Sequence, residues 1–261
     1  MSETERVNEV KAGKEERASH ARRYLKAIQT LQRRIIEDQS RLLEYVAARM
    51  VETIGRDGRL FIFGTGHSHL LAEEAFFRAG GLAPVVPIFS SALMLHENVE
   101  LGSRLERSPD LAADLLERYR PQPDEMIFIF SNSGVNQLPV EMALRAKERG
   151  LFVVSVASLE YAQVAPLSPI GKRLDEVADV ALDNGGRPGD ALLSIEGFSW
   201  RVAPSSTIAG ALIWNALVAE TAALLQAAGR EVPAFASLNM EGAAEHNEAL
   251  LKKWRGQNPH L

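Results

Sequence analysis

The sequence has 261 residues, of which 46% are apolar and 24% are charged, the proportions of an ordinary globular protein with a full core. Its formal net charge of −5 excludes the strongly basic surface with which many proteins recruit nucleic acid or acidic lipid. Because the sequence contains no cysteine, it also excludes a disulfide scaffold, an iron–sulfur cluster and a cysteine-ligated zinc site.

Neither a secretory signal nor a membrane span is predicted. Residues 1–17 are charged and lack the apolar stretch of a signal peptide. The longest apolar stretch, from Thr207 to Leu225, is interrupted by Asn215 and Glu220, a pattern that predicts a buried helix. We therefore expect a cytoplasmic protein with neither a membrane nor a nucleic-acid partner.

Residues 15–54 predict one or two long helices, because their apolar side chains recur at three- and four-residue spacings. These side chains are Tyr24, Leu25, Ile28, Leu31, Ile35, Leu42, Leu43 and Val46. A helix of this length before the first strand has few other elements to pack against. Half of its apolar face therefore either contacts another subunit or packs within the chain. We divide the chain into an N-terminal helical arm for oligomerisation, 1–54, and a ligand-binding domain, 55–261.

Beyond residue 54, apolar runs alternate with helical patterns. Strands are predicted at 59–66, 84–88, 125–130, 151–156 and 177–182, and helices at 69–79, 136–149, from 205 onward and at 241–254. This alternation indicates an α/β fold with a doubly wound parallel sheet. Two long irregular stretches, 89–109 and 183–201, are of the kind that is usually disordered or functional in a compact domain.

The first strand ends in the glycine turn Gly64-Thr65-Gly66-His67-Ser68. Glycines at this position let the backbone approach a ligand, and the N-terminus of the next helix favours an anion. A dinucleotide site would have a third glycine where His69 stands and an acidic residue near the end of the second strand, and both are missing. His67 and His69, two apart on a turn, do not share a face, so we expect no metal site. The alternative is a tight turn without a ligand.

The third predicted strand runs directly into the loop Ser131-Asn132-Ser133-Gly134, and Asn136 opens the next helix. Hydroxyl, amide and backbone N–H groups at a helix N-terminus can hold a phosphate dianion without lysine or arginine. One such residue is an ordinary helix cap, but a cap alone does not explain three within six positions after a buried strand. This loop is the best candidate for a phosphate site.

These segments resemble, in the right order, those of sugar isomerase (SIS) domain proteins. FGTGHSH resembles the first glycine turn of that family, and SNSGVN resembles its phosphate signature, Ser-x-Ser-Gly-x-Thr/Ser. The stretches GLFVVSVAS, SPIGKRLDEVADVAL and APSSTIAGALIWNALVAETAALL resemble the later segments of the family, the last of them as in arabinose-5-phosphate isomerases. The resemblance covers about residues 55–230. The chain most resembles a stand-alone phosphosugar-binding or isomerase type, similar to arabinose-5-phosphate and phosphoheptose isomerases.

The resemblance implies a five-stranded parallel sheet, a homodimer or homotetramer with its site near the subunit interface, and a phosphosugar at the carboxyl ends of the strands. It implies no cofactor and no metal. The phosphate-binding residues that it implies are Ser131, Asn132, Ser133, Asn136 and Ser68; the sugar-binding ones are Gly64, Gly66, His67, Ser205, Ser206 and Thr207. The sequence departs from the family at Asn136, where Thr or Ser is usual, at Val135, where aldose–ketose isomerases often have Glu, and at His67, where arabinose-5-phosphate isomerases have Lys.

Isomerisation of an aldose to a ketose needs a base for the proton shared between C1 and C2 and an acid to open the ring. The candidates are Glu97, His96, His246 and Glu74, with Glu73 as a further option; for each, the alternative is a solvated polar residue. In related folds, a histidine such as His246 often comes from a neighbouring subunit. Glu196 and Trp200 could shape the sugar pocket or be ordinary loop residues.

The leading expectation is an isomerase that acts on a phosphorylated sugar by acid–base chemistry without a cofactor. A sugar-phosphate lyase or etherase on the same fold is an alternative. So is a non-catalytic phosphosugar sensor, although such sensors often carry a DNA-binding module and no helix-turn-helix pattern is recognised before the domain.

Overall fold

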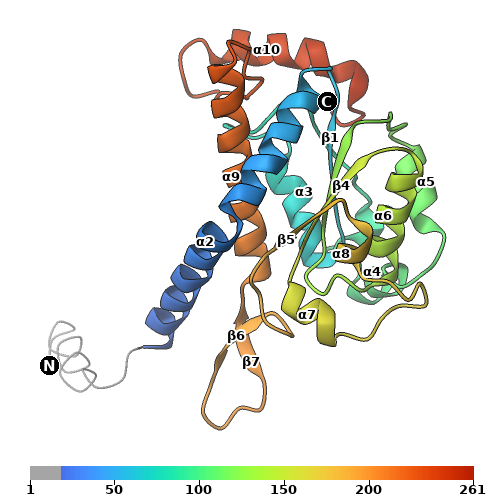
Figure 1. Ribbon diagram of the computed structural model, residues 1–261, viewed down its shortest axis with the longest axis vertical. Coiled ribbons are helices and arrows are strands. Elements are labelled where there is room, and N and C mark those ends of the chain that lie inside the picture. The colour runs from blue at the N-terminus through green and yellow to red at the C-terminus, as the bar shows by residue number, and fades with distance from the viewer. Residues whose placement is uncertain (1–18) are drawn as a thin grey trace, which may run out of the picture.

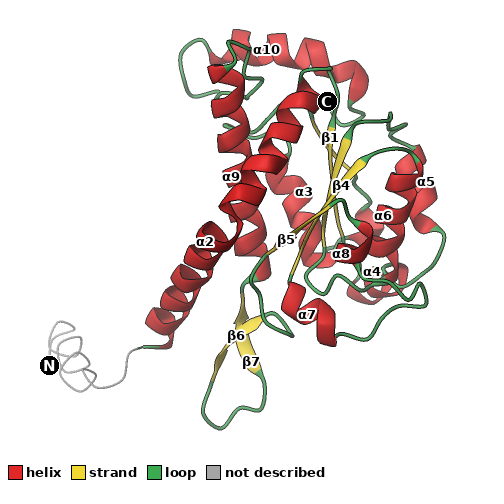
Figure 2. Ribbon diagram, in the orientation of Figure 1, coloured by secondary structure: helices red, strands yellow, loops and turns green. Residues whose placement is uncertain are grey.

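The computed structural model describes residues 19–261, which form a parallel sheet of five strands between two layers of helices (Figures 1 and 2). The strand order is β2-β1-β3-β4-β5. The bounds are β1 Leu60–Gly64, β2 Val85–Pro87, β3 Met126–Phe130, β4 Phe152–Ala157 and β5 Val180–Asp183. All five predicted strands are confirmed. The apolar runs of β1 to β4 are buried on both faces, as is usual for parallel strands, whereas alternate residues of the edge strand β5 are partly exposed.

The helices between the strands cover the two faces of the sheet. Helices α2 (His20–Ile54), α3 (His69–Ala75) and α9 (Ser206–Ala227) pack on one face, and α5 (Leu111–Glu117), α6 (Gln137–Glu148) and α8 (Leu174–Val177) pack on the other. The remaining helical segments are α4 Val99–Leu105, α7 Leu159–Val164 and α10 Ala243–Trp254, with short 3-10 turns η1 Gly66–Ser68, η2 Ser91–Leu93 and η3 Arg255–Gln257. The doubly wound α/β prediction is therefore correct.

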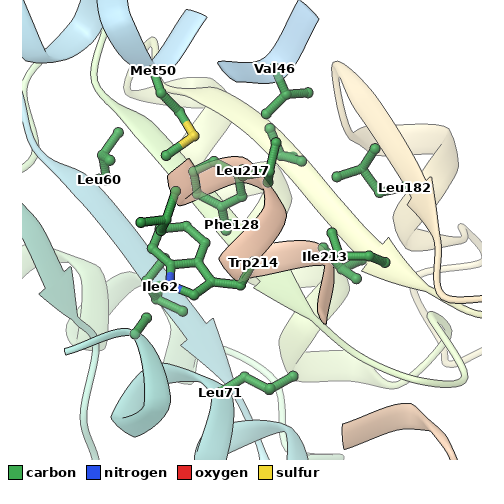
Figure 3. Packing of buried hydrophobic residues seen from close by; sticks show 14 of the residues in the cluster. Val46, Met50, Leu60, Ile62, Leu71, Phe128, Leu182, Ile213, Trp214 and Leu217 are labelled. Carbon is green, nitrogen blue, oxygen red and sulfur yellow. The ribbon is translucent and has the colours of Figure 1, made fainter. Parts of the chain in front are cut away.

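The predicted N-terminal helix forms as the single 35-residue helix α2; the part of that prediction before Ser19 lies outside the described residues. Its C-terminal half belongs to the core, because Val46, Ala47 and Met50 are fully buried. Figure 3 shows Val46 and Met50 beside α9. Its N-terminal half extends beyond the sheet (Figure 1), and Leu25 and Ile36 there are 61% and 63% exposed. Ile28, Leu31 and Ile35 in the same half are nevertheless buried, so the helix packs within the chain along one face from residue 28 onward. A role of the exposed Leu25 and Ile36 in oligomerisation stays a prediction.

Helix α9 is the only helix within residues 19–261 whose length and mean hydropathy would suit a membrane span. Its Ile213, Trp214 and Leu217 are buried between the sheet and α2, with Trp214 edge-on to Phe128 (Figure 3). The prediction of a buried core helix is confirmed.

The two stretches predicted as irregular contain regular structure. Residues 89–109 include η2 and α4, and residues 183–201 include most of an antiparallel hairpin, β6 (Ala191–Ser194) and β7 (Arg201–Pro204). The hairpin projects from the body beside the start of α9 (Figures 1 and 2). These elements were missed because each has only three to seven residues, too few for a clear periodicity.

Helix α3 ends at Ala75 instead of residue 79. Phe76 takes an extended conformation and packs edge-on against Phe89, while Phe77, at φ 40°, packs edge-on against Phe235. Contacts with distant aromatic rings therefore override the local helical pattern.

Candidate functional site

A small pocket lies at the carboxyl ends of β1, β3 and β4, where the N-termini of α3 and α9 approach the sheet. Parallel α/β sheets bind their ligands at this edge. The pocket is lined by Ser68, Leu71, Phe130, Ser131, Asn132, Val156, Asn184, Ser206, Thr207 and Gly210. Five of the predicted site residues are among them, namely Ser68, Ser131, Asn132, Ser206 and Thr207. Residues that are far apart in the sequence therefore meet here.

The glycine turn brings Ser68 to this pocket through a very close backbone contact. A Cβ atom on Gly64 would lie only 2.3 Å from the carbonyl oxygen of Ser68. Gly66 follows at φ 55°, a left-handed conformation that costs glycine little. The hydrogen bond from the Ser68 N–H to the Thr65 carbonyl, at 3.0 Å, then closes the turn η1. His67 is exposed beside the pocket and does not line it.

The serine loop turns sharply out of β3. The N–H of Ser131 still donates to the carbonyl of Val156 on β4 at 3.1 Å, and the N–H of Gly134, at φ 63°, donates back to the Ser131 carbonyl at 3.1 Å. Ser131 and Asn132 line the pocket, whereas Ser133 and Asn136 are partly exposed next to it. The loop itself is thus the part of this segment that faces the pocket.

The first turn of α6 offers fewer free N–H groups than expected. Leu138 donates its N–H to the backbone carbonyl of Glu106 at 2.9 Å, and Pro139 has no N–H. The donors for a ligand must therefore come from the loop residues and from Gln137.

Asn184 is a pocket residue that the sequence reasoning missed. Its Nδ2 donates to Oδ1 of Asn132 at 2.9 Å, and its own Oδ1 accepts from the N–H of Gly186 at 2.8 Å. Asn184 is only 3% exposed, so both hydrogen bonds are shielded from water. This pair fixes Asn132 with its amide nitrogen free to donate. The sequence did contain a feature that could have predicted Asn184: it is a polar residue shortly after the fifth predicted strand, at the edge of the sheet where the other site residues were expected.

The N-terminus of α9 carries a carboxylate that the sequence reasoning also missed. Asp190 Oδ1 accepts from the N–H groups of Ser205 and Ser206 at 3.0 and 2.8 Å, and Oδ2 accepts from the Ser206 hydroxyl at 2.7 Å. Ser205 is fully buried, and its hydroxyl is 3.3 Å from the Asp190 carbonyl oxygen. Of the predicted trio, Thr207 alone lines the pocket without a hydrogen bond to a described residue.

The acid–base candidates His96 and Glu97 follow a residue that lies close to the glycine turn. Both are exposed in the loop that leads to α4, and their neighbour Leu95 is 4.0 Å from the position of a Cβ on Gly66. Glu106 was not predicted, yet its Oε1 accepts a hydrogen bond from the Thr65 hydroxyl within the turn. A carboxylate is therefore fixed against the glycine turn.

The other acid–base candidates lie apart from the pocket within one chain. Glu74 pairs with Arg78 and accepts from Asn215 Nδ2 at 3.3 Å, and Glu73 lies 3.8 Å from His69. His246 is on α10 and bonds the Ala234 carbonyl at 2.8 Å.

Figure 1 shows α10 at the end of α9 opposite the hairpin, and a helix of 22 residues is about 33 Å long. His246 would thus reach a pocket only in another subunit. Glu196 and Trp200 are exposed on the hairpin.

His69 is a buried structural residue. It is fully buried, stacks on Phe89 with ring centroids 5.2 Å apart, and its Nε2 is 3.5 Å from the N–H of Ser90. Burial lowers the pKa of His69 to about 4, so the ring is neutral near pH 7. Residues 19–261 contain no cluster of three or more His, Asp or Glu side chains with the arrangement of a metal site.

Comparisons with known proteins found relatives in sequence and in fold. The family model for the SIS domain matches residues 23–158. A UPF0309 protein of Shouchella clausii is 40% identical over 92% of this chain and 98% of its own length, and one of Brucella anthropi is 40% identical over 88% and 93%. A solved phosphoheptose isomerase from Francisella tularensis has a TM-score of 0.51 at 12% identity, covering 85% of this chain and 98% of its own. That last likeness shows the fold alone.

Proposed function

Since the chain belongs to the SIS-domain family, among its UPF0309 proteins, we propose that the pocket binds the phosphate group of a phosphorylated sugar. One observation carries the proposal: four segments contribute hydroxyl and amide groups to one small pocket at the carboxyl edge of the sheet. They are the glycine turn with Ser68, the serine loop with Ser131 and Asn132, Asn184 behind β5, and the start of α9.

The chemistry of the lining suits a phosphate. Within residues 19–261 the lining holds neutral donors and apolar side chains, with no Lys or Arg. Hydrogen bonds to a charged group contribute about 1.5–3 kcal/mol each, and the positive end of the α9 dipole adds to them. The pocket is small, so the phosphate would occupy it while the sugar extends toward the glycine turn and the loop of His96.

The reaction that we propose is aldose–ketose isomerisation. It needs a base that moves a proton between C1 and C2, and acid–base groups do stand around the glycine turn: His96 and Glu97 on the exposed loop, and Glu106 against Thr65. His246 joins this set only if a homodimer or homotetramer brings it from a neighbouring subunit.

A specific observation favours a second candidate, a phosphosugar sensor without catalysis. No titratable side chain lines the pocket in the described part of the chain. A sensor would bind the same ligand and leave it unchanged. A lyase or etherase would break a bond in it.

Binding is tested by a thermal-shift screen and calorimetry against pentose, hexose, heptose and amino-sugar phosphates, with the parent sugars as controls. A ligand at one hundred times its Kd stabilises the fold by about 2.7 kcal/mol. The double variant Ser131→Ala/Ser133→Ala should stay folded and lose binding, whereas Ser40→Ala, on an exposed turn of α2, should bind normally. Normal binding by the double variant would refute the phosphate assignment.

The reaction is tested by proton NMR of the bound phosphosugar in D₂O. An isomerase exchanges the proton at C2 for deuterium and forms the ketose. A lyase or etherase releases a fragment, and a sensor changes neither. An unchanged spectrum at saturating protein and ligand would exclude the isomerase and leave the sensor.

A further inference from the structure

The Asp190 carboxylate sits where a helix N-terminus binds an anion. Its two oxygens accept from two consecutive backbone N–H groups and from a serine hydroxyl, all at the first residues of the 22-residue helix α9. These are the contacts that a phosphate makes at such a position. The chain therefore holds an anion of its own at this end of α9.

Ser206 belongs both to this contact and to the pocket. Its hydroxyl carries one hydrogen and its backbone amide another, and both point to Asp190. Ser206 consequently has no hydrogen left for a ligand while Asp190 stays in place. Thr207, the next residue, lines the pocket as well.

We propose that Asp190 occupies an anion position that the ligand's phosphate takes over, and that the hairpin β6–β7 is a strap displaced when it does. The inference rests on the proposed function, because it assumes a phosphate in the pocket. A carboxylate and a phosphate dianion that share Ser206 repel each other strongly in a half-buried site. Binding at α9 and retention of Asp190 are thus mutually exclusive.

Three residues at the base of the hairpin have a left-handed backbone conformation. Asp190 directly precedes β6 and has φ 67°, and Ala203 on β7 has φ 66°. Aspartate adopts this left-handed conformation readily, whereas alanine is strained in it, and both residues lie next to the Ala191–Pro204 pair of the hairpin. Gly189, at φ 79°, gives the chain a flexible joint before Asp190.

The hairpin carries a natural reporter. Trp200 is 77% exposed near its tip, whereas Trp214 and Trp254, the other tryptophans of the chain, are each 1% exposed in the core. A movement of the hairpin changes the surroundings of Trp200 alone. Its fluorescence therefore separates movement of the strap from binding in the pocket.

The test measures the affinity for inorganic phosphate by calorimetry and follows tryptophan emission during the titration. Asp190→Asn keeps an oxygen that accepts from the α9 amides but removes the charge, and it should bind phosphate about tenfold more tightly than the wild type. Glu196→Gln removes a charge from the exposed end of the same hairpin and should bind as the wild type does. Phosphate should change the emission of the wild type and leave that of Trp200→Phe unchanged.

The outcomes distinguish this inference from the proposed function. Equal phosphate affinity for the wild type and Asp190→Asn, without a change in Trp200 emission, overturns the strap and identifies Asp190 as a structural cap. The proposed function is then untouched. If neither protein binds phosphate or any phosphosugar, the proposed function fails, and this inference fails with it.

Discussion

The side chain of Gln39 hydrogen-bonds both backbone groups of Asp183 on the edge strand β5. Its Nε2 donates to the Asp183 carbonyl at 2.6 Å, and its Oε1 accepts from the Asp183 N–H at 2.7 Å. The amide thus makes the pair of bonds that a neighbouring strand would make. Because Asp183 in turn accepts from the N–H groups of Leu159 and Gly185, Gln39 fixes the end of β5 next to the pocket residue Asn184.

We expect Gln39→Leu to lower the free energy of unfolding by about 1–2 kcal/mol, because two backbone groups at a partly buried edge lose their partners. Chemical denaturation measures the change. Gln29→Leu, on an exposed turn of the same helix, is the matched control and should be nearly neutral. Equal effects of the two substitutions would mean that the bonds to Asp183 contribute nothing.

Gly64→Ala should destabilise the fold by about 3 kcal/mol or more and abolish phosphosugar binding. The new Cβ would meet the Ser68 backbone oxygen at 2.3 Å, and backbone cannot move aside as a side chain can. Gly256→Ala, with no atom within 4 Å of its Cβ, should behave as the wild type. A folded Gly64→Ala variant of wild-type stability would show that the close approach at the glycine turn is wrong.

Asn184→Ala should weaken phosphosugar binding by about tenfold, since Asn132 loses the partner that orients its amide. The loss should appear in the Kd measured by calorimetry. Asn215→Ala, which removes an exposed asparagine of α9 that does not line the pocket, should leave the Kd unchanged. A wild-type Kd for Asn184→Ala would show that the orientation of the Asn132 amide by Asn184 does not contribute to ligand binding.

Protonation of His69 should destabilise the protein in mild acid. Burial lowers the pKa of His69 from 6.5 to about 4, so between these values the unfolded chain binds a proton that the folded chain does not. The stabilisation present above pH 6.5 is therefore lost as the pH falls toward 4, and it amounts to about 3 kcal/mol.

The measurement is the free energy of unfolding of the wild type and of His69→Phe across this range. His69→Phe keeps a ring against Phe89 and should show a shallower loss of stability with falling pH. His67→Gln, which removes an exposed imidazole from the same turn, should follow the wild type. Parallel curves for the wild type and His69→Phe would assign the acid sensitivity to other groups.

The sequence was sufficient for the sheet and for much of the pocket, because those features are local. Each strand is a short apolar run that ends in small or polar residues, and Ser68 and Ser131 each follow such a run. Thr207 was predicted from the family resemblance at the start of the long helix. Since the carboxyl ends of parallel strands share one edge, placing them together needed no knowledge of the packing.

The missing residues act through contacts that no local pattern encodes. Asn184 meets Asn132 across 52 positions, and Asp190 meets Ser206 across 16, inside a stretch whose short strands carry no clear alternation. Glu106 reaches Thr65 only because α4 folds against the glycine turn. Likewise, His246 has the residue type expected of an acid or base, but the direction of α9 carries it to the far end of the molecule.

The other edge of the sheet is closed by Asn258, whose buried Nδ2 donates to the carbonyl of Val85 on β2 at 3.0 Å. Gln39 is synthesised before β5, whereas Asn258 follows Val85 by 173 positions. During translation, the residue that bonds the β5 edge is therefore made before its strand, and the residue that bonds the β2 edge is made long after its strand. An unpaired strand edge can pair with other chains. A nascent chain that has not yet reached Asn258 therefore exposes β2 as a site of aggregation.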